Sequence, residues 1–187
     1  MNARFHLRDF TRAAHRRTDA AFSVLDLTQR DDYGIFLKTH LLAYRAMMPV
    51  FEADLPAERR PPAMADLLVE DLHALGLDPP RAVAPDFDGD ALGAAYVVAG
   101  SHFGQRVLSG QHGRSGDAAV RGARRYLSSP ALKTYWPILQ KAIEQAMESP
   151  RAADRLDQLS AGAEKTFALF DHCLTLVLQE GACHEFA

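Results

Sequence analysis

Apolar residues in this chain recur at intervals of three and four positions almost throughout, and this helical period constrains the fold more than any other feature. No segment shows the clean alternation of apolar and polar residues that marks a half-buried strand. The segment 31–53 is the clearest example, because its aromatic and aliphatic residues form a broad apolar stripe typical of a buried helix. The sequence therefore predicts an all-α fold, and a length of 187 residues suits one compact domain over 1–187.

Proline, glycine and serine divide this helical pattern into separate elements. Proline-rich segments interrupt it at 55–62 and 78–90. Ser129-Pro130 and Ser149-Pro150 each resemble an N-cap serine followed by proline at the first helical position. The predicted helices are 5–22, 31–53, 63–75, 90–109, 118–127, 130–147 and 150–180.

Charge and cysteine content exclude several classes of function. The chain has 21 basic and 24 acidic residues, a balance that does not favour nucleic-acid binding. Its N-terminus lacks the apolar core of a secretory signal, and no stretch approaches the ~20 continuous apolar residues of a membrane span. The two cysteines, Cys173 and Cys183, are too few for a disulfide scaffold. We therefore expect a cytoplasmic protein that neither spans a membrane nor binds nucleic acid.

Two glycines stand one helical turn apart in the segment 96–108, YVVAGSHFGQRVL. An interior glycine costs a helix about 1 kcal/mol relative to alanine, so Gly100 and Gly104 on one face require a reason. One reason is a flat ligand that must touch the backbone, and the other is a second helix that packs closely. The choice depends on whether another segment supplies chemistry for a ligand.

One face of the first predicted helix supplies such chemistry. Residues at three- and four-position spacing share this face: Arg8, Thr11, His15, Asp19 and Phe22. An imidazole suits a metal and a guanidinium suits carboxylates, so the face fits a planar metal macrocycle with acidic edge groups. Taken alone, a single histidine on an amphipathic helix is more often a core or boundary residue with one hydrogen bond.

Together, these two segments resemble the heme oxygenase family. LRDFTRAAHRRTDAAF, at 7–22, is similar to the first helix of that family. AAYVVAGSHFGQRVL, at 94–108, resembles its distal helix, whose bacterial members commonly read YVxEGSxLGxxxL. YLSSPALKTYWPILQKAI and AEKTFALFDHCL are similar to later helices, so the resemblance covers nearly the whole chain in the same order.

The resemblance implies a single-domain helical fold that holds heme between a proximal and a distal helix. His15 corresponds to the proximal iron ligand. Arg8 corresponds to a basic partner of a heme propionate, and Asp19 to an acidic residue that orients the proximal region. Thr11 and Phe22 complete the expected proximal face of the heme site.

On the distal side, Gly100, Ser101 and Gly104 correspond to the catalytic segment, where the backbone approaches heme and leaves room for O₂. The implied activity is O₂- and electron-dependent cleavage of heme to biliverdin, CO and ferrous iron, with heme as both substrate and cofactor. The expected partner is a redox protein, because the electrons come from an external reductase or ferredoxin.

Two residues of the distal segment depart from the family pattern. Ala99 stands where many members carry glutamate, and His102 stands where a smaller polar residue is common. His102 lies about 160° around the helix from both glycines, so we expect its ring outside the pocket. These departures support an alternative reading, a heme carrier or sensor without turnover.

Two further alternatives belong to other classes. One is a helical domain that binds a different small molecule. The other, a di-iron carboxylate enzyme, needs two Glu-x-x-His pairs, whereas Glu70 and His73 form a single one.

Other polar and aromatic residues receive structural interpretations. His40 lies on the apolar stripe of its helix, which predicts a hydrogen-bonded core histidine. Trp136 is predicted to pack in the interior, with one polar partner for its indole N–H. Further candidates for propionate binding are Arg16, Arg17, Lys133 and Lys141.

Overall fold

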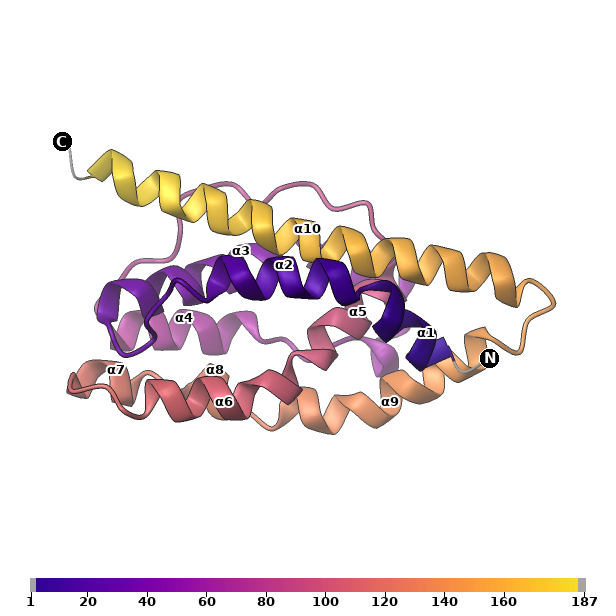
Figure 1. Ribbon diagram of the computed structural model, residues 1–187, viewed down its shortest axis with the longest axis horizontal. Helices are drawn as coiled ribbons and strands as arrows, with labels where there is room; N and C mark the ends of the chain where they lie inside the picture. Colours follow the sequence, from indigo (N-terminus) through magenta and orange to yellow (C-terminus); the bar gives the residue numbers. More distant parts are fainter. Residues whose placement is uncertain (1–2, 185–187) are drawn as a thin grey trace.

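The computed structural model describes residues 3–184, and the regular elements in this range are helices that form a single body (Figure 1). The elements are α1 (Ala3–Phe10), α2 (Arg12–Phe22), α3 (Arg30–Asp54), the 3-10 turn η1 (Ala57–Arg59), α4 (Ala65–Ala74), α5 (Ala91–Gly100), α6 (His102–His112), α7 (Ala118–Gly122), α8 (Arg125–Ser128), α9 (Ala131–Ala146) and α10 (Ala152–His184). The predicted all-α class is confirmed. Among the described helices, none is both long and apolar enough to cross a membrane.

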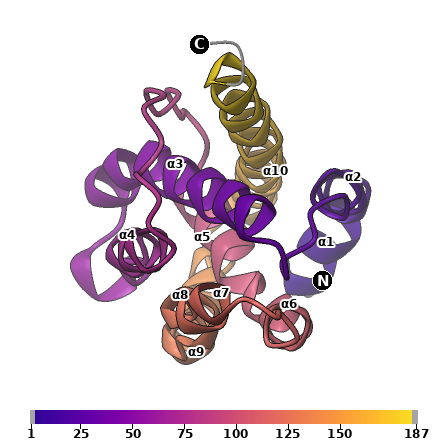
Figure 2. The same ribbon diagram turned by 90° about the vertical axis from the view of Figure 1, so that its left-hand side faces the viewer.

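The central helix α5 organises the core. It packs against α10, α9 and α3, and Figure 2 shows it in the middle of the bundle. Close packing here depends on two glycines. A Cβ added to Gly93 would lie 2.3 Å from the carbonyl oxygen of Leu159 in α10, and one added to Gly162 would lie 2.6 Å from the Cβ of Asp90. Close helix contact in this chain is therefore made at Gly93 and Gly162.

The predicted first helix is divided at Thr11 into α1 and α2. Thr11 donates to the carbonyl of Leu7 both from its backbone N–H, at 2.9 Å, and from its hydroxyl, at 2.8 Å. A buried threonine that bonds back to the preceding turn bends a helix. The bend lies one turn before His15.

The predicted helix 90–109 is likewise divided, at Ser101, into α5 and α6. The Ser101 hydroxyl donates to the Val98 carbonyl at 2.8 Å, and the Nδ1 atom of His102 lies 2.7 Å from the Ala99 carbonyl oxygen. These side chains occupy carbonyls at the end of α5, which loosens the helical ladder at this point. The kink brings the segment with Gly100 and Gly104 to the junction of two helices.

The remaining boundaries follow the predicted ones closely. The chain turns after α4 at Gly76, whose φ of 66° suits glycine. The hydroxyls of Ser129 and Ser149 accept from the backbone N–H groups of Ala131 and Arg151, at 3.3 and 3.2 Å. Both serines therefore satisfy backbone donors near a helix start, but α9 begins at Ala131 and α10 at Ala152, after the prolines that the Ser-Pro pattern placed at the first helical position. The segment predicted as a helix over 118–127 forms two short helices, α7 and α8.

Candidate functional site

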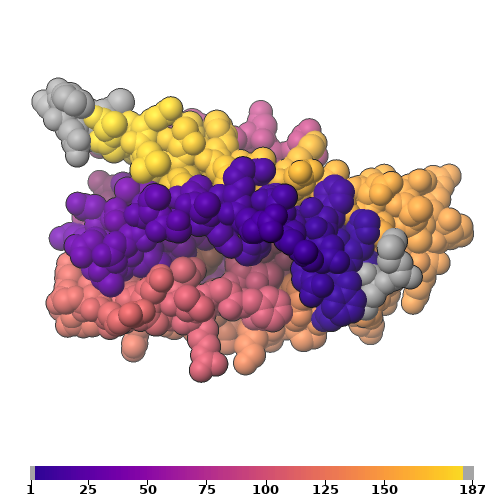
Figure 3. Space-filling model, viewed as in Figure 1, coloured from indigo at the N-terminus to yellow at the C-terminus, as the bar shows by residue number. Residues whose placement is uncertain are grey.

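A cavity of about 1040 Å³ lies between the pair α1–α2 and the junction of α5 with α6. Figure 3 shows the surface hollowed between α2 and α6. Such a volume is at the upper end of the range for small-molecule sites. The predicted site residues from both segments line this one cavity: Arg8, Thr11, His15, Asp19, Phe22, Gly100, Ser101 and Gly104.

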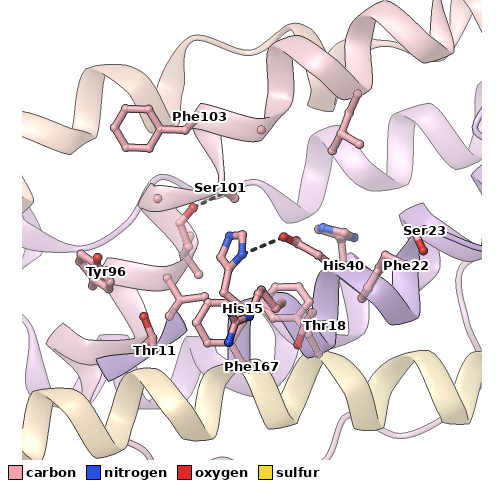
Figure 4. Close-up of a pocket in the computed structure, with 18 of the residues that line it drawn as sticks. Thr11, His15, Thr18, Phe22, Ser23, His40, Tyr96, Ser101, Phe103 and Phe167 are labelled. Atoms are coloured by element: carbon pink, nitrogen blue, oxygen red, sulfur yellow. Dashed lines mark hydrogen bonds and ion pairs between the residues drawn. The ribbon is translucent and has the colours of Figure 1, made fainter. Parts of the chain in front are cut away.

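His15 extends from α2 into this space (Figure 4). Its Nδ1 atom lies 2.8 Å from a carboxylate oxygen of Asp19, one turn later on the same helix, and 59% of its side chain is exposed. An ionised carboxylate only accepts, so this contact assigns a hydrogen to Nδ1, and in the neutral ring Nε2 then carries the lone pair. The ring of Phe167 packs edge-on at 5.5 Å between centroids. A neutral imidazole oriented by a carboxylate in this way is suited to bind a metal.

The two glycines of the α5–α6 junction face open space. Apart from the neighbouring backbone of its own helix, a Cβ added to Gly100 or Gly104 would meet no heavy atom of residues 3–184 within 4 Å. Close helix packing therefore does not explain them, in contrast to Gly93 in the preceding turns of α5. Because both line the cavity, a ligand in it can approach the backbone directly.

Arginine side chains follow the cavity along α1 and α2. Arg4, Arg8, Arg12 and Arg16 all line it, and their four-residue spacing places them on one side of the two helices. Asp9 forms ion pairs with Arg8 and Arg12, and the hydrogen bond from Arg12 lowers the pKa of that carboxyl. Like charges at this spacing repel, so a ligand with carboxylates would be favoured here.

Of the further basic candidates from the sequence, Arg16 lines the cavity, whereas Arg17, Lys133 and Lys141 do not. Arg17 follows His15 by two residues, a rotation of about 200° around the helix, and pairs with Asp171 of α10. Lys133 and Lys141 on α9 are not among the residues that line the cavity.

His102 and Trp136 occupy one aromatic cluster at the cavity wall. As expected from its helical position, His102 is not among the lining residues, and its ring packs 5.5 Å from that of Trp136. Trp136 itself lines the cavity and is half-buried, with Tyr96 at 6.0 Å between ring centroids. Its ring packs against the core, as predicted, although it is only partly buried. Within residues 3–184 its indole N–H has no hydrogen-bond acceptor, so the predicted polar partner is wrong.

The innermost wall of the cavity contains polar residues that the sequence analysis did not place there. His40 has its Nδ1 atom 2.8 Å from the Phe36 carbonyl oxygen, as predicted for a satisfied histidine, yet it also lines the cavity. Burial lowers the pKa of His40 to about 4, so its ring is neutral at physiological pH. Tyr44 and Tyr126 lie beside it, and burial raises the pKa of both hydroxyls. The sequence spacing of His40 and Tyr44 indicates that they share one face of α3. It does not show that this face borders a cavity.

Glu70, from the single Glu-x-x-His pair, forms an ion pair with Arg125 at 2.8 Å on the surface of α4.

No protein-family model and no curated protein matches the sequence of this chain. Among solved structures, it is similar to the heme oxygenase from Neisseria meningitidis, crystallised with NO and CO bound. The TM-score is 0.71 at 20% sequence identity, and the match covers 96% of this chain and 93% of the other. This chain has the heme oxygenase fold. The shared fold extends over nearly all of both chains, so the predicted helical fold is confirmed.

Proposed function

We propose that the protein is a heme oxygenase, which binds heme through His15 and cleaves it to biliverdin, CO and ferrous iron. One observation carries the proposal. An imidazole with a free Nε2 atom and the bare backbone of Gly100 and Gly104 line one cavity, in a chain with the heme oxygenase fold.

The residues present fit a heme group. Phe22, Phe36 and Phe170 provide apolar walls, His15 provides a nitrogen ligand, and arginines provide partners for two carboxylates. Heme bound in this cavity would supply an iron centre that binds and activates O₂.

The chain's own groups have distinct roles in this proposal. Asp19 holds the hydrogen on Nδ1 of His15, which keeps Nε2 directed to the metal. Gly100 and Gly104 leave open space in the cavity, which a bound heme would fill against their backbone. Arg8 and Arg16 line the cavity and would hold the propionates of heme.

The reaction requires electrons, for which we propose an external reductase or ferredoxin as partner. Such donors operate in the reducing cytoplasm, which is also where two cysteines without a disulfide scaffold are expected. Cys173 is buried as a free thiol within α10.

A heme carrier or sensor is the second candidate function. The observation that favours it is the Ser101 hydroxyl, whose hydrogen is donated to the Val98 carbonyl at 2.8 Å and so does not reach a ligand. Ala99, beside it, is fully buried and adds no polar group.

One experiment separates these functions. The purified protein is titrated with heme, reduced without O₂, and then exposed to O₂ while absorbance and CO are measured. An oxygenase gives a Soret band that is replaced by biliverdin absorbance with release of CO. A heme spectrum that persists under O₂ would support the carrier, and absence of a Soret band would contradict both functions.

His15→Ala tests the proposed ligand in the same assay. We expect it to lose the histidine-ligated spectrum and turnover. His73→Ala, an exposed histidine on α4 away from the cavity, is the matched control and is expected to behave as wild type.

A further inference from the structure

The helix that carries His15 has few apolar attachments to the rest of the molecule. Of the 11 residues of α2, Ala14 is the buried one, and it packs in a small cluster with Val97, Ala163 and Phe167. Figure 2 shows α2 at the edge of the bundle, beside α10. Apolar contact therefore holds α2 at the turn of Ala14 and at its last residue, Phe22, which packs against Phe36 and His40 of α3.

A carboxylate on α10 provides a further attachment, one turn beyond Ala14. The Thr18 hydroxyl donates to one oxygen of Asp171 at 2.7 Å, and Nε of Arg17 donates to the other at 3.0 Å. Asp171 thus bonds to two consecutive residues of α2 through both of its oxygens. Its side chain is 26% exposed, and bonds to an ionised carboxylate are stronger than neutral ones.

The apolar contact and the carboxylate contact lie about one turn apart on both α2 and α10. His15 precedes Thr18 by three residues, and Phe167, which packs against the His15 ring, precedes Asp171 by four. α2 and α10 run in the same direction (Figure 1). The apolar contact fixes where α2 touches α10, and the carboxylate fixes the rotation of α2 about its own axis. That rotation determines where the imidazole points.

We propose that Asp171 is a positioning residue, which through Thr18 and Arg17 holds α2 in the rotation that aims Nε2 of His15 into the cavity. Asp171 itself does not line the cavity. The identity of the ligand as heme rests on the proposed function. The attachment of α2 to Asp171 does not, because it is present in the chain without a ligand. Iron–histidine ligation therefore depends on a residue that touches neither the metal nor the macrocycle.

Hydrogen exchange in the heme-free protein tests the attachment. In Asp171→Ala, we expect the amides of α2 to exchange about tenfold faster, which corresponds to about 1.4 kcal/mol, while those of α5 stay unchanged. Asp88→Ala is the matched control, because Asp88 forms an ion pair of 2.9 Å with Lys165 on the same helix α10, away from α2. Unchanged exchange in α2 of Asp171→Ala would overturn the inference, whether or not heme binds.

Heme-loaded protein tests the positioning. For Asp171→Ala we expect about tenfold faster release of heme and a heterogeneous iron–histidine stretching band. Asp171→Asn keeps an oxygen that can accept from Thr18. Its rate of heme release is expected to lie between those of Asp171→Ala and wild type. Wild-type release and a single wild-type band in Asp171→Ala would overturn the positioning role. Failure of the wild type to bind heme would instead contradict the proposed function, and the exchange result would still decide the attachment of α2.

Discussion

Gly104 lies inside α6, and apart from the backbone of that helix no heavy atom of the described residues lies within 4 Å of the position that its Cβ would take. Alanine is a better helix former than glycine, so Gly104→Ala is expected to raise the free energy of unfolding of the heme-free protein by about 0.5–1 kcal/mol. The same methyl group projects into the cavity and is expected to weaken heme binding. Thermal unfolding and heme titration measure these two effects.

The opposite signs of the two effects distinguish a glycine that faces a ligand from one that allows close packing. A lower melting temperature of the heme-free Gly104→Ala variant would show that Gly104 has a packing role. Unchanged heme affinity would remove Gly104 from the proposed site.

His40 gives the protein a pH-dependent stability. Burial lowers its pKa to about 4 in the folded state, from the ordinary value of 6.5. At a pH between these two pKa values, the unfolded chain binds a proton at His40 that the folded chain does not. The free energy of unfolding is therefore highest above pH 6.5 and falls as the pH drops toward 4. Between pH 7 and pH 5 we expect the wild type to lose about 2 kcal/mol more than His40→Gln, which does not titrate. Urea unfolding at both pH values measures this difference, and equal losses in the two proteins would contradict it.

At the scale of helices, the contact between α5 and α10 limits side-chain size. A Cβ on Gly93 would lie 2.3 Å from the backbone oxygen of Leu159 and 2.9 Å from the backbone nitrogen of Ala163. Backbone atoms of a packed helix cannot move aside cheaply, so Gly93→Ala is expected to destabilise the protein by about 2 kcal/mol. Chemical unfolding of Gly93→Ala and Gly104→Ala in parallel checks this. The same change from glycine to alanine should lower the free energy of unfolding at position 93 and raise it at position 104. A stability of Gly93→Ala at or above wild type would contradict the close contact.

Helix positions followed from the sequence, but the breaks within helices did not. Apolar spacing and Ser-Pro pairs located the helices because those signals act within a few residues. At the breaks, the hydroxyls of Thr11 and Ser101 bond to backbone carbonyls of the preceding turn. Thr166 makes the same kind of bond inside the unbroken helix α10, so neither the residue type nor this bond alone locates a break.

Part of the site was also visible in the sequence. His15 and Asp19 are four residues apart, so their contact depends only on local helical geometry. The residues at the inner wall come together from α3, α8 and α10, and no local pattern records how those helices converge. For this reason His40, Tyr126 and Phe170 were placed by the structure alone.

At the scale of the whole molecule, the cavity separates α1 and α2 from most of the bundle, and a ligand in it would connect the two sides. A ligand that binds the folded state stabilises it by mass action, by about 2.7 kcal/mol when its free concentration is 100 times Kd. For a chain of this size, 1 kcal/mol corresponds to about 2–4 °C, so heme is expected to raise the Tm by about 5–10 °C. Calorimetry with and without heme measures the rise, and removal of heme should reverse it.

The rise in Tm with heme can also be compared between the wild type and single-residue variants. His15→Ala is expected to show a smaller rise at equal free heme, because the metal ligand is lost, whereas His73→Ala should match the wild type. Asp171→Ala is expected to show a reduced rise, because part of the binding free energy must order α2 before His15 reaches the metal. An equal rise in all four proteins would mean that heme binds without using α2. Heme binding would then be independent of both His15 and the carboxylate that orients its helix.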